Sequence, residues 1–218
     1  PVMAALSRAE DDIAAITGLR IGRVRLMAFP SSSVSLVPRA LAQVRREHPG
    51  VHVSFTEAEP PEAIAALRAG DCDLGVVFSY PGSPVARGED LDDFVVHHLL
   101  TEKVGVALPK THPLAETDIV DLTDLSDADW IAGCPRCRGH LLQAGYQPRL
   151  SFETEDYVAV QGFIAAGLGV ALIPDLIRQA TRNDDVVIRP LKQATVREIH
   201  VVTTDDLSQV PAIAATLS

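Results

Sequence analysis

Apolar residues recur with two periodicities along this chain, one typical of strands and one typical of helices. Between residues 19 and 27 apolar and polar positions alternate, which predicts a strand. A turn over 30–33 follows, and apolar positions then recur every three or four residues from Leu36 to Val44, which predicts a helix that ends at Pro49. One strand, a hydroxyl-rich turn and one helix therefore open a first α/β unit.

The alternation of strands and helices continues to the end of the chain. Strands are expected at 51–56, 73–78, 94–100, 103–108, 130–132, 150–152, 170–173, 186–188 and 199–202, and helices at 140–144, 156–166, 176–180 and 210–217, with another ending at Gly70. Strands that alternate with helices predict a parallel sheet with right-handed crossovers. Because two strand-like segments separate two sets of similar size, we expect two α/β units.

Composition restricts the functions that such a chain can have. Hydrophobic residues make up 47% of the 218 residues and charged residues 22%, so the chain can bury a sizeable core. The formal net charge is -10, and no basic cluster exceeds the pair Arg45 and Arg46. This chain is therefore not expected to bind nucleic acid by itself.

Signals for membranes, export and catalysis are missing from the sequence. No run of about 18 apolar residues occurs and the first ten residues lack the order of a signal peptide, so we expect a cytoplasmic protein without a membrane partner. An odd number of cysteines, three, fits a reducing compartment. No glycine-rich phosphate loop, G-x-S-x-G elbow or metal triad is found, so neither an enzyme nor a cofactor is expected.

Several short motifs, in order, carry a family resemblance over nearly the whole chain. They are LRIG at 19–22, LVP at 36–38, HP at 48–49, LRAGDCDL at 67–74, HPLA at 112–115 and AAGLGVALIP at 165–174. Together they resemble the C-terminal effector-binding (regulatory) domain of LysR-type transcriptional regulators. The resemblance implies an α/β, two-lobed type 2 periplasmic-binding-protein-like fold, with two crossing strands and an effector cleft between the lobes.

The resemblance also implies a division of the chain and a set of partners. Residues 1–17 would end a linker helix, 18–97 with 197–218 would form regulatory lobe I, 98–192 lobe II, and 193–196 the hinge return. The domain would bind a small-molecule effector and signal to an N-terminal winged helix-turn-helix domain that this sequence lacks, which would contact DNA. Family members form homodimers or homotetramers, and we expect outer helix faces such as Leu36 to Arg46 to contribute.

Candidate effector contacts in the first lobe follow two strands. Ser31, Ser32 and Ser33 lie where a strand ends and a helix begins, so hydroxyl and N–H groups are expected to face an effector carboxylate or carbonyl. The serines could instead only cap the helix. Phe78 and Ser79 leave the next strand at a position where relatives contact effectors, which would make the site partly apolar, although Phe78 could equally be core.

Candidate contacts in the second lobe include two arginines and a threonine. Arg136 and Arg138 would supply the counter-charge for an anionic effector. Thr154 precedes two acidic residues and is expected to cap the following helix, where by resemblance it also faces the effector.

Two alternatives remain open at this point. The arginines beside Cys134 and Cys137 would favour thiolate, which permits a redox-sensor variant, although peroxide-sensing relatives space their cysteines further apart. Zinc would lack a convincing fourth ligand after Cys134, Cys137 and His140, so no metal is expected. A free-standing solute-binding protein of the same fold is the other alternative.

Overall fold

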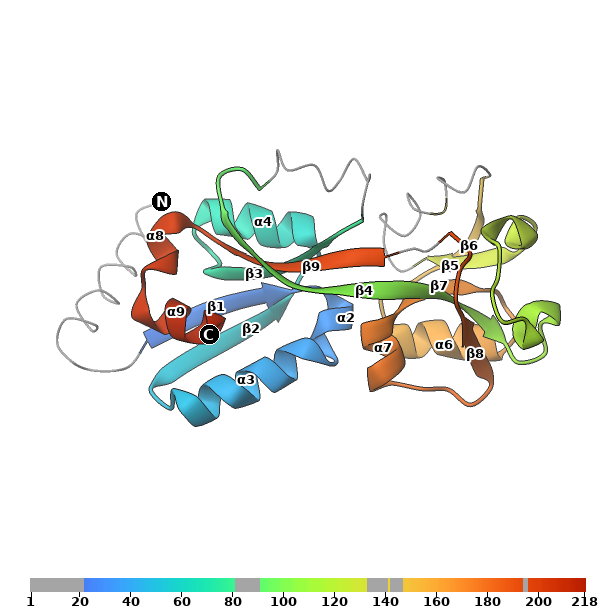
Figure 1. Cartoon of the computed structure of the whole chain (residues 1–218), viewed down its shortest axis with the longest axis horizontal. Helices are drawn as coiled ribbons and strands as arrows, with labels where there is room; N and C mark the ends of the chain where they lie inside the picture. Colours follow the sequence, from blue (N-terminus) through green and yellow to red (C-terminus); the bar gives the residue numbers. More distant parts are fainter. Residues whose placement is uncertain (1–21, 81–90, 133–140, 142–146, 194–195) are drawn as a thin grey trace. The chain divides into compact units, whose positions relative to one another are not determined.

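The computed structural model describes residues 22–80, 91–132, 141, 147–193 and 196–218 (Figure 1). They divide into two compact units. Residues 22–78, 91–100 and 199–218 belong to unit 1, and the other described residues belong to unit 2. Two strands, β4 (Val95–Pro109) and β9 (Val196–Thr203), contribute residues to both units.

Unit 1 is built on a sheet with the strand order β2 (Val51–Glu57), β1 (Gly22–Ala28), β3 (Leu74–Ser79), β9 and β4. Strand β1 pairs in parallel with β2 over its full length and with β3 from Leu26 to Ala28. The parallel sheet expected from the alternation of elements is therefore confirmed for these strands. Their carboxyl ends lie at one edge of the sheet.

Helices cover both faces of the sheet of unit 1. They are α2 (Pro30–Ser33), α3 (Leu36–Glu47), α4 (Pro60–Ala69), α8 (Asp205–Ser208) and α9 (Pro211–Leu217). Helix α4 lies on one face and α3 on the other (Figure 1). Helix α9 contacts α3 and β1, so it shares the face of α3.

The alternation within β1 explains this two-sided packing. Val24, Leu26 and Ala28 are buried on one face. Met27 points to the other face and packs against the cluster that includes Ile64 of α4. Because β1 has apolar side chains packed on both of its faces, it lies inside the sheet, between β2 and β3.

Unit 2 contains two short sheets and their covering helices. Its elements are η3 (Pro113–Glu116), η4 (Leu122–Leu125), β5 (Asp129–Ala132), β6 (Arg149–Glu153), α6 (Tyr157–Ala165), β7 (Ala171–Pro174), α7 (Asp175–Ala180) and β8 (Val186–Arg189). Strand β4 pairs antiparallel with both β7 and β8, while β5 and β6 pair in parallel. A uniformly parallel sheet is therefore the wrong prediction for unit 2.

The core of unit 2 gathers side chains from both of its sheets. Buried Ala107, Ile131, Ile164 and Ile173 form one cluster with neighbours from β7, α6 and α7. Phe152 and Phe163 stack at the edge of this cluster with ring centroids 4.8 Å apart. Burial of these apolar surfaces holds α6 against the strands.

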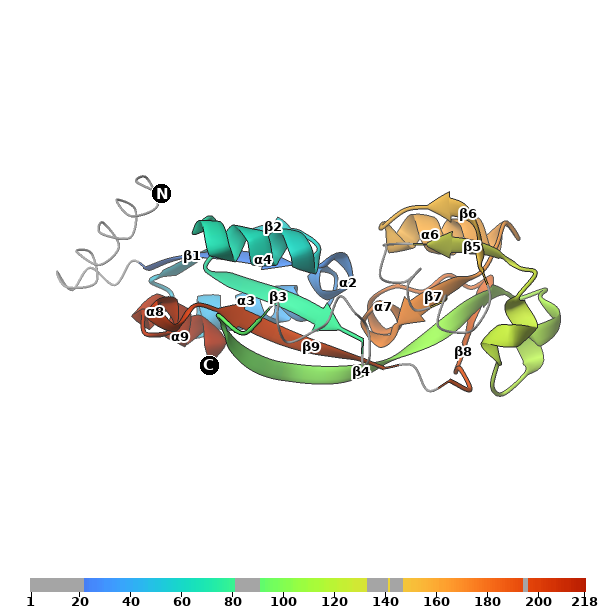
Figure 2. The ribbon, with the colours of Figure 1, turned by 90° about the horizontal axis from the view of Figure 1, so that it is seen from above.

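Two expectations about single elements differ from the structure, and three short helices were not expected. Segments 94–100 and 103–108 form one strand, β4, seen as a continuous ribbon in Figure 2. The turn at 30–33 is a single helical turn, α2, because Ser32 and Ser33 donate backbone N–H groups to the Phe29 carbonyl. Helix α8 and the two 3₁₀ helices have no apolar period long enough to reveal them.

Glycines end two helices as expected from the sequence. Gly70 at the end of α4 has φ 76° and Gly167 after α6 has φ 75°. This left-handed conformation is costly for residues with a Cβ atom. At both helix ends the backbone geometry thus follows from the residue type.

A buried ion pair joins three elements of unit 2. Arg197 on β9 donates from Nε to Oε1 of Glu102 on β4 at 2.5 Å, and each side chain is only 3% exposed. The second oxygen of Glu102 accepts the backbone N–H of Leu176 in α7 at 2.8 Å. Burial alone lowers the pKa of Arg197, but the Glu102 carboxylate beside it raises that pKa above its usual value.

The length and apolar character of the helices bear on whether they can cross a membrane. In the parts of the chain that the structure describes, no helix is both long and apolar enough to cross a membrane.

The buried pair predicts an asymmetric response to substitution. Arg197→Met leaves the Glu102 carboxylate buried without its counter-charge, so we expect a loss of about 3–5 kcal/mol in the free energy of unfolding. Replacing both residues by Met should recover most of this loss, because no buried charge remains. Urea unfolding measures all three proteins.

The matched control is Arg149→Met, which breaks the exposed pair with Asp129. It should cost less than about 1 kcal/mol. An equally small loss for Arg197→Met would show that the buried pair does not hold unit 2 together.

Candidate functional site

The carboxyl ends of β1 and β3 bring two of the predicted segments together in unit 1. The rings of Phe29 and Phe78, which lie at these ends, meet edge to face with centroids 4.8 Å apart and an interplanar angle of 74°. Both rings are buried. The serine turn follows Phe29 directly, and Ser79 follows Phe78 and is half-buried. Strand pairing thus places both candidate segments at one edge, where ligands of parallel sheets bind.

The sequence suggested that the serine hydroxyls face an effector, but two of them donate to the backbone instead. Ser32 donates from Oγ to the Phe29 carbonyl at 2.7 Å, and Ser33 donates to the same oxygen at 3.1 Å. Because a hydroxyl carries one proton, neither group can donate to a ligand at the same time. They can accept a hydrogen bond, and they fix the turn that carries buried Ser31.

The alternative role of these serines as caps of the following helix is wrong. The residue before α3 is Ser35, and its side chain makes no capping hydrogen bond. The hydroxyls of Ser32 and Ser33 instead bond back to Phe29, a local pattern common for serine near turns.

Phe78 contributes mainly to the core of unit 1. Its side chain is 6% exposed and contacts Phe29. An effector contact from Phe78 would have to come from the small exposed part of the ring, and this role stays a prediction.

The expectation that Thr154 caps the next helix is wrong. Asp156 is the capping residue of α6, and its carboxylate accepts the backbone N–H of Val158 at 2.8 Å and that of Ala159 at 3.3 Å. The Asp156 carboxylate is a better cap than the Thr154 hydroxyl because it accepts two hydrogen bonds and carries negative charge at the positive end of the helix. Thr154 accepts the N–H of Asp156 at 3.2 Å, which leaves its hydroxyl proton for another acceptor.

A small apolar space lies next to the start of α6. It measures about 10 Å³ and is lined by Ile131, Ala132, Leu141, Tyr157, Val160, Ala171 and Leu172. A volume of this size is at most that of one water molecule. It does not provide an effector site in unit 2 by itself.

Four predicted residues lie outside the described part of the chain: Arg136, Arg138, Cys134 and Cys137. His140, the third residue considered for zinc, lies there as well. Within the described residues, no group of three or more His, Cys, Asp or Glu side chains is placed to hold a metal ion.

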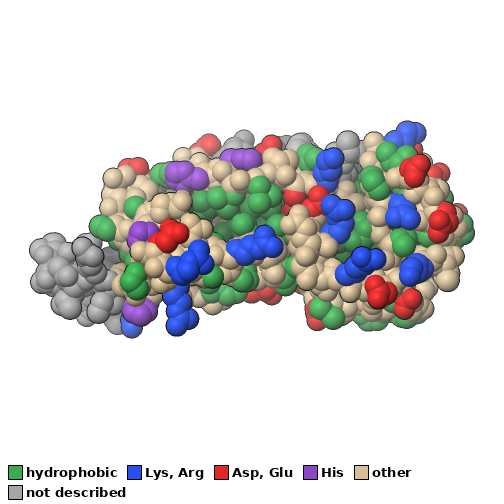
Figure 3. Space-filling model, turned by 60° about the horizontal axis from the view of Figure 1, so that its bottom comes forward, with side chains coloured by type: hydrophobic (Ala, Val, Ile, Leu, Met, Phe, Trp, Pro, Cys, Tyr) green, Lys and Arg blue, Asp and Glu red, His purple; other side chains and the backbone are tan. Residues whose placement is uncertain are grey.

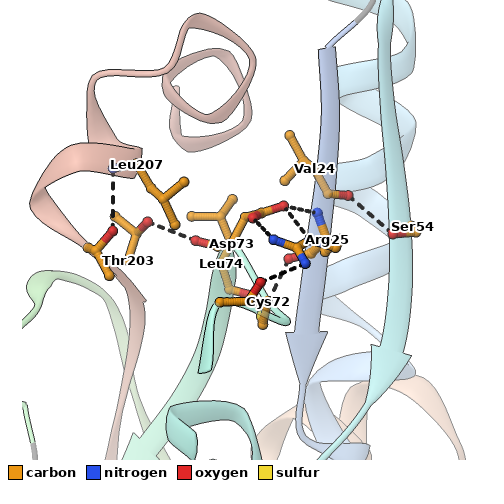
Figure 4. A network of polar contacts seen from close by, with 10 residues as sticks. Val24, Arg25, Ser54, Cys72, Asp73, Leu74, Thr203 and Leu207 are labelled. Atoms are coloured by element: carbon orange, nitrogen blue, oxygen red, sulfur yellow. Dashed lines mark hydrogen bonds and ion pairs between the residues drawn. The ribbon is translucent and has the colours of Figure 1, made fainter. Parts of the chain in front are cut away.

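A charged network that no sequence motif indicated joins the middle of β1 to the residue before β3 (Figure 4). The Arg25 guanidinium binds both carboxylate oxygens of Asp73, at 2.6 and 3.1 Å, and its third nitrogen donates to the Gly70 carbonyl at 2.8 Å. The hydroxyl of Thr203 donates to the Asp73 carbonyl at 2.7 Å. The Asp73 hydrogen bond raises the pKa of Arg25. Asp73 in the motif at 67–74 therefore has a structural role, because it holds this network together.

Cys72 lies beside this network in a fully buried position. Its thiol donates to the Leu74 carbonyl at 3.0 Å, and burial raises the pKa of the thiol to about 11. Cys72 therefore stays protonated and unreactive at neutral pH.

Comparison with known proteins shows which family this chain is similar to. Residues 17–218 match the family model described as LysR substrate binding domain. The chain is 29% identical over 184 residues to the transcriptional dual regulator GltC of Bacillus subtilis, a match that covers 79% of this chain and 57% of GltC. The chain thus spans little more than half the length of this relative.

Two solved structures show the same fold. One is the C-terminal domain of a probable LysR family transcriptional regulator from Rhodococcus sp. RHA1, with a TM-score of 0.74, 21% identity, and coverage of 90% of this chain and 97% of the other. The other is the BenM effector-binding domain with its effector benzoate, with a TM-score of 0.70, 20% identity, and coverage of 89% and 88%. The two-lobed fold expected from the sequence is confirmed by these likenesses.

The environment of Cys72 predicts its reactivity. With iodoacetamide at pH 8, Cys72 should remain unmodified in the folded protein and react fully in guanidinium, because a thiol with a pKa of about 11 is almost entirely protonated. Peptide mass spectrometry locates the modification. Alkylation of Cys72 at equal rates in both conditions would contradict the buried position.

Proposed function

The chain belongs to the LysR substrate-binding domain family, and from this premise we propose that it is the effector-sensing part of a transcription regulator. The family match over residues 17–218 carries the proposal. Further support comes from the fold, which is shared with a domain solved with its effector, benzoate. That ligand belongs to BenM, and the effector of this chain is a separate question.

The proposal for the whole protein reaches beyond this chain. A winged helix-turn-helix domain would contact DNA, and binding of effector to the sensing domain would change that contact. The named relative GltC, of which this chain covers 57%, supports the proposal because it is a transcriptional regulator. We also propose a cytoplasmic location and no catalysis, since the relatives are regulators of transcription.

We propose the lobes at 18–97 with 197–218 and at 98–192, with 193–196 as the return. In lobe I the effector would contact the turn at Ser31 and the end of β3 at Phe78 and Ser79. Two observations support this choice: the strands end there side by side, and Ser32 and Ser33 hold the turn in one conformation. In lobe II the contacts would come from Arg136, Arg138 and Thr154.

Effector binding is tested by a thermal-shift screen of bacterial metabolites, followed by calorimetric titration of the compounds that raise Tm. Ser31→Ala should weaken binding about two- to tenfold, because it removes one neutral hydrogen bond. For an anionic compound, Arg136→Ala or Arg138→Ala should weaken binding roughly ten- to a hundredfold.

The control is Ser54→Ala on the edge strand β2, whose hydroxyl bonds the Val24 carbonyl at 3.4 Å. It should bind the compound as tightly as the unsubstituted protein. If no metabolite raises Tm, sensing is not the function of this chain. If Ser31→Ala and both arginine variants bind normally, the site has been placed wrongly.

Self-association is the second part of the proposal. Helix α3 buries Val37 and Val44 against its own unit, while Ala40 and Gln43 on its outer face are exposed. Two relatives with known structures share this fold, and closed homo-oligomers are the common state of regulators with symmetric sites. We propose that the outer face of α3 lies in the dimer contact.

Ala40→Glu tests this contact by placing a charge on the outer face of α3. Sedimentation equilibrium at micromolar concentration should show a shift from dimer toward monomer, because an unpaired carboxylate at an interface is costly to desolvate. Ala65→Glu, on the exposed side of α4, is the matched control and should leave the dimer intact. A strict monomer for the unsubstituted protein would refute self-association.

A further inference from the structure

Unit 2 contains a pocket that none of the effector contacts above uses. Its volume is about 360 Å³, which is within the range of small-molecule sites. The lining comes from β4, α7, β8 and the start of β9 and consists of Lys103, Val104, Gly105, Asp175, Arg178, Ile188, Arg189, Pro190, Leu191 and Val196. These residues are distant in sequence, so only the fold brings them together.

The charges in this pocket do not balance. Three cations, Lys103, Arg178 and Arg189, face a single carboxylate, Asp175. Arg178 uses that carboxylate, with Nε 3.0 Å from Oδ1. Among the described residues, neither Lys103 nor Arg189 has a carboxylate within salt-bridge distance. The pocket is therefore cationic in a chain whose formal net charge is -10.

The acidic residue next to Lys103 does not correct this imbalance. Glu102 points to the other side of β4, where its two oxygens bind Arg197 and the N–H of Leu176. Its charge is neutralised inside the protein. Cations left without such partners repel one another, and an anionic ligand relieves this repulsion.

The floor of the pocket is apolar and shaped by a glycine. A Cβ atom at Gly105 would lie 2.9 Å from both the Arg189 carbonyl and Cγ2 of Ile188, closer than any side chain allows. Glycine at this position lets β8 approach β4 and sets the Arg189 backbone at the pocket wall. Val104 and Leu191 are buried beside it.

The corresponding hollow in unit 1 has a different character. It measures about 290 Å³, and its cations Arg25 and Arg68 share it with the carboxylates of Asp73, Asp93 and Asp206. Arg25 is held by Asp73 on two oxygens. Acidic groups outnumber basic ones there, so that hollow does not favour an anion.

We propose that the pocket of unit 2 binds an organic anion: a carboxylate, sulfonate or phosphate ester with a compact apolar body. Arg189 and Lys103 bind the anionic group, and Arg178 assists from α7. The apolar body lies on Gly105 and Ile188. The face of unit 2 shown in Figure 3 carries Lys and Arg side chains interspersed with Asp and Glu, so the excess of cations is a property of the pocket lining. Neither Ser31 nor Thr154 lines this pocket, so it would act as a second ligand site.

The test uses two probes on the purified chain. 1-Anilinonaphthalene-8-sulfonate combines a sulfonate with an apolar body and is followed by fluorescence, while inorganic phosphate carries charge alone and is followed by its ability to displace the first probe. Lys103→Gln and Arg189→Gln should each raise the Kd of the sulfonate about three- to tenfold, because each removes one charge-assisted contact that is partly exposed to water. Phosphate should bind at least about tenfold more weakly, since it cannot bury apolar surface.

Arg182→Gln is the matched control, since Arg182 is 86% exposed in unit 2, pairs with Asp184 and does not line the pocket. Its Kd should equal that of the unsubstituted protein, and circular dichroism should show all three variants folded. Three results would overturn the proposal: unchanged affinity in both pocket variants, an equal loss in Arg182→Gln, or phosphate binding as tight as sulfonate binding. A change of sedimentation coefficient in the pocket variants without loss of sulfonate binding would assign the face to a second copy instead. None of these outcomes depends on Ser31→Ala, so the effector proposal stands or falls separately.

Discussion

The buried pair between Glu102 and Arg197 constrains the packing of unit 2. Two charges that are almost completely shielded from water are tolerated because each satisfies the other, and because the remaining carboxylate oxygen accepts the N–H of Leu176 in the first turn of α7. The pair therefore fixes β4, β9 and α7 relative to one another within this unit. Helix α7 is six residues long, and burial of Leu176 and Ile177 holds it in place together with this contact.

The same pair decides the electrostatics of the neighbouring pocket. Side chains alternate along a strand, so Glu102 and Lys103 on β4 point to opposite sides of the sheet. Glu102 is paired with Arg197 in the interior, and Lys103 is left on the pocket side without a carboxylate partner among the described residues. The structural ion pair thus affects ligand binding in the pocket, because the Glu102 carboxylate is bound to Arg197 and does not neutralise the cations of the pocket.

Unit 1 uses a charged contact in a different way. Arg25, in the middle of β1, and Asp73, directly before β3, form a two-point contact, and the Arg25 side chain is partly exposed. This contact sets the pairing of the two parallel strands, and the pairing then brings Phe29 and Phe78 together at the carboxyl ends. The candidate effector turn at Ser31 therefore depends on a contact away from that edge of the sheet.

The sequence by itself determined the family, the order of most elements and the helix ends at Gly70 and Gly167, because these depend on local periodicity, motifs and the conformational freedom of glycine. The capping of α6 was misjudged by two residues, since both Thr154 and Asp156 are good caps and only the backbone decides between them. Tertiary structure alone decided the antiparallel pairing of β4 and the partners of Glu102 and Asp73, and the local backbone conformation decided the bonding of Ser32 and Ser33 to Phe29. Some of these features join residues that are far apart in the chain, and others depend on which of several equivalent hydrogen-bond acceptors is used. Neither kind of feature leaves a local pattern in a single sequence.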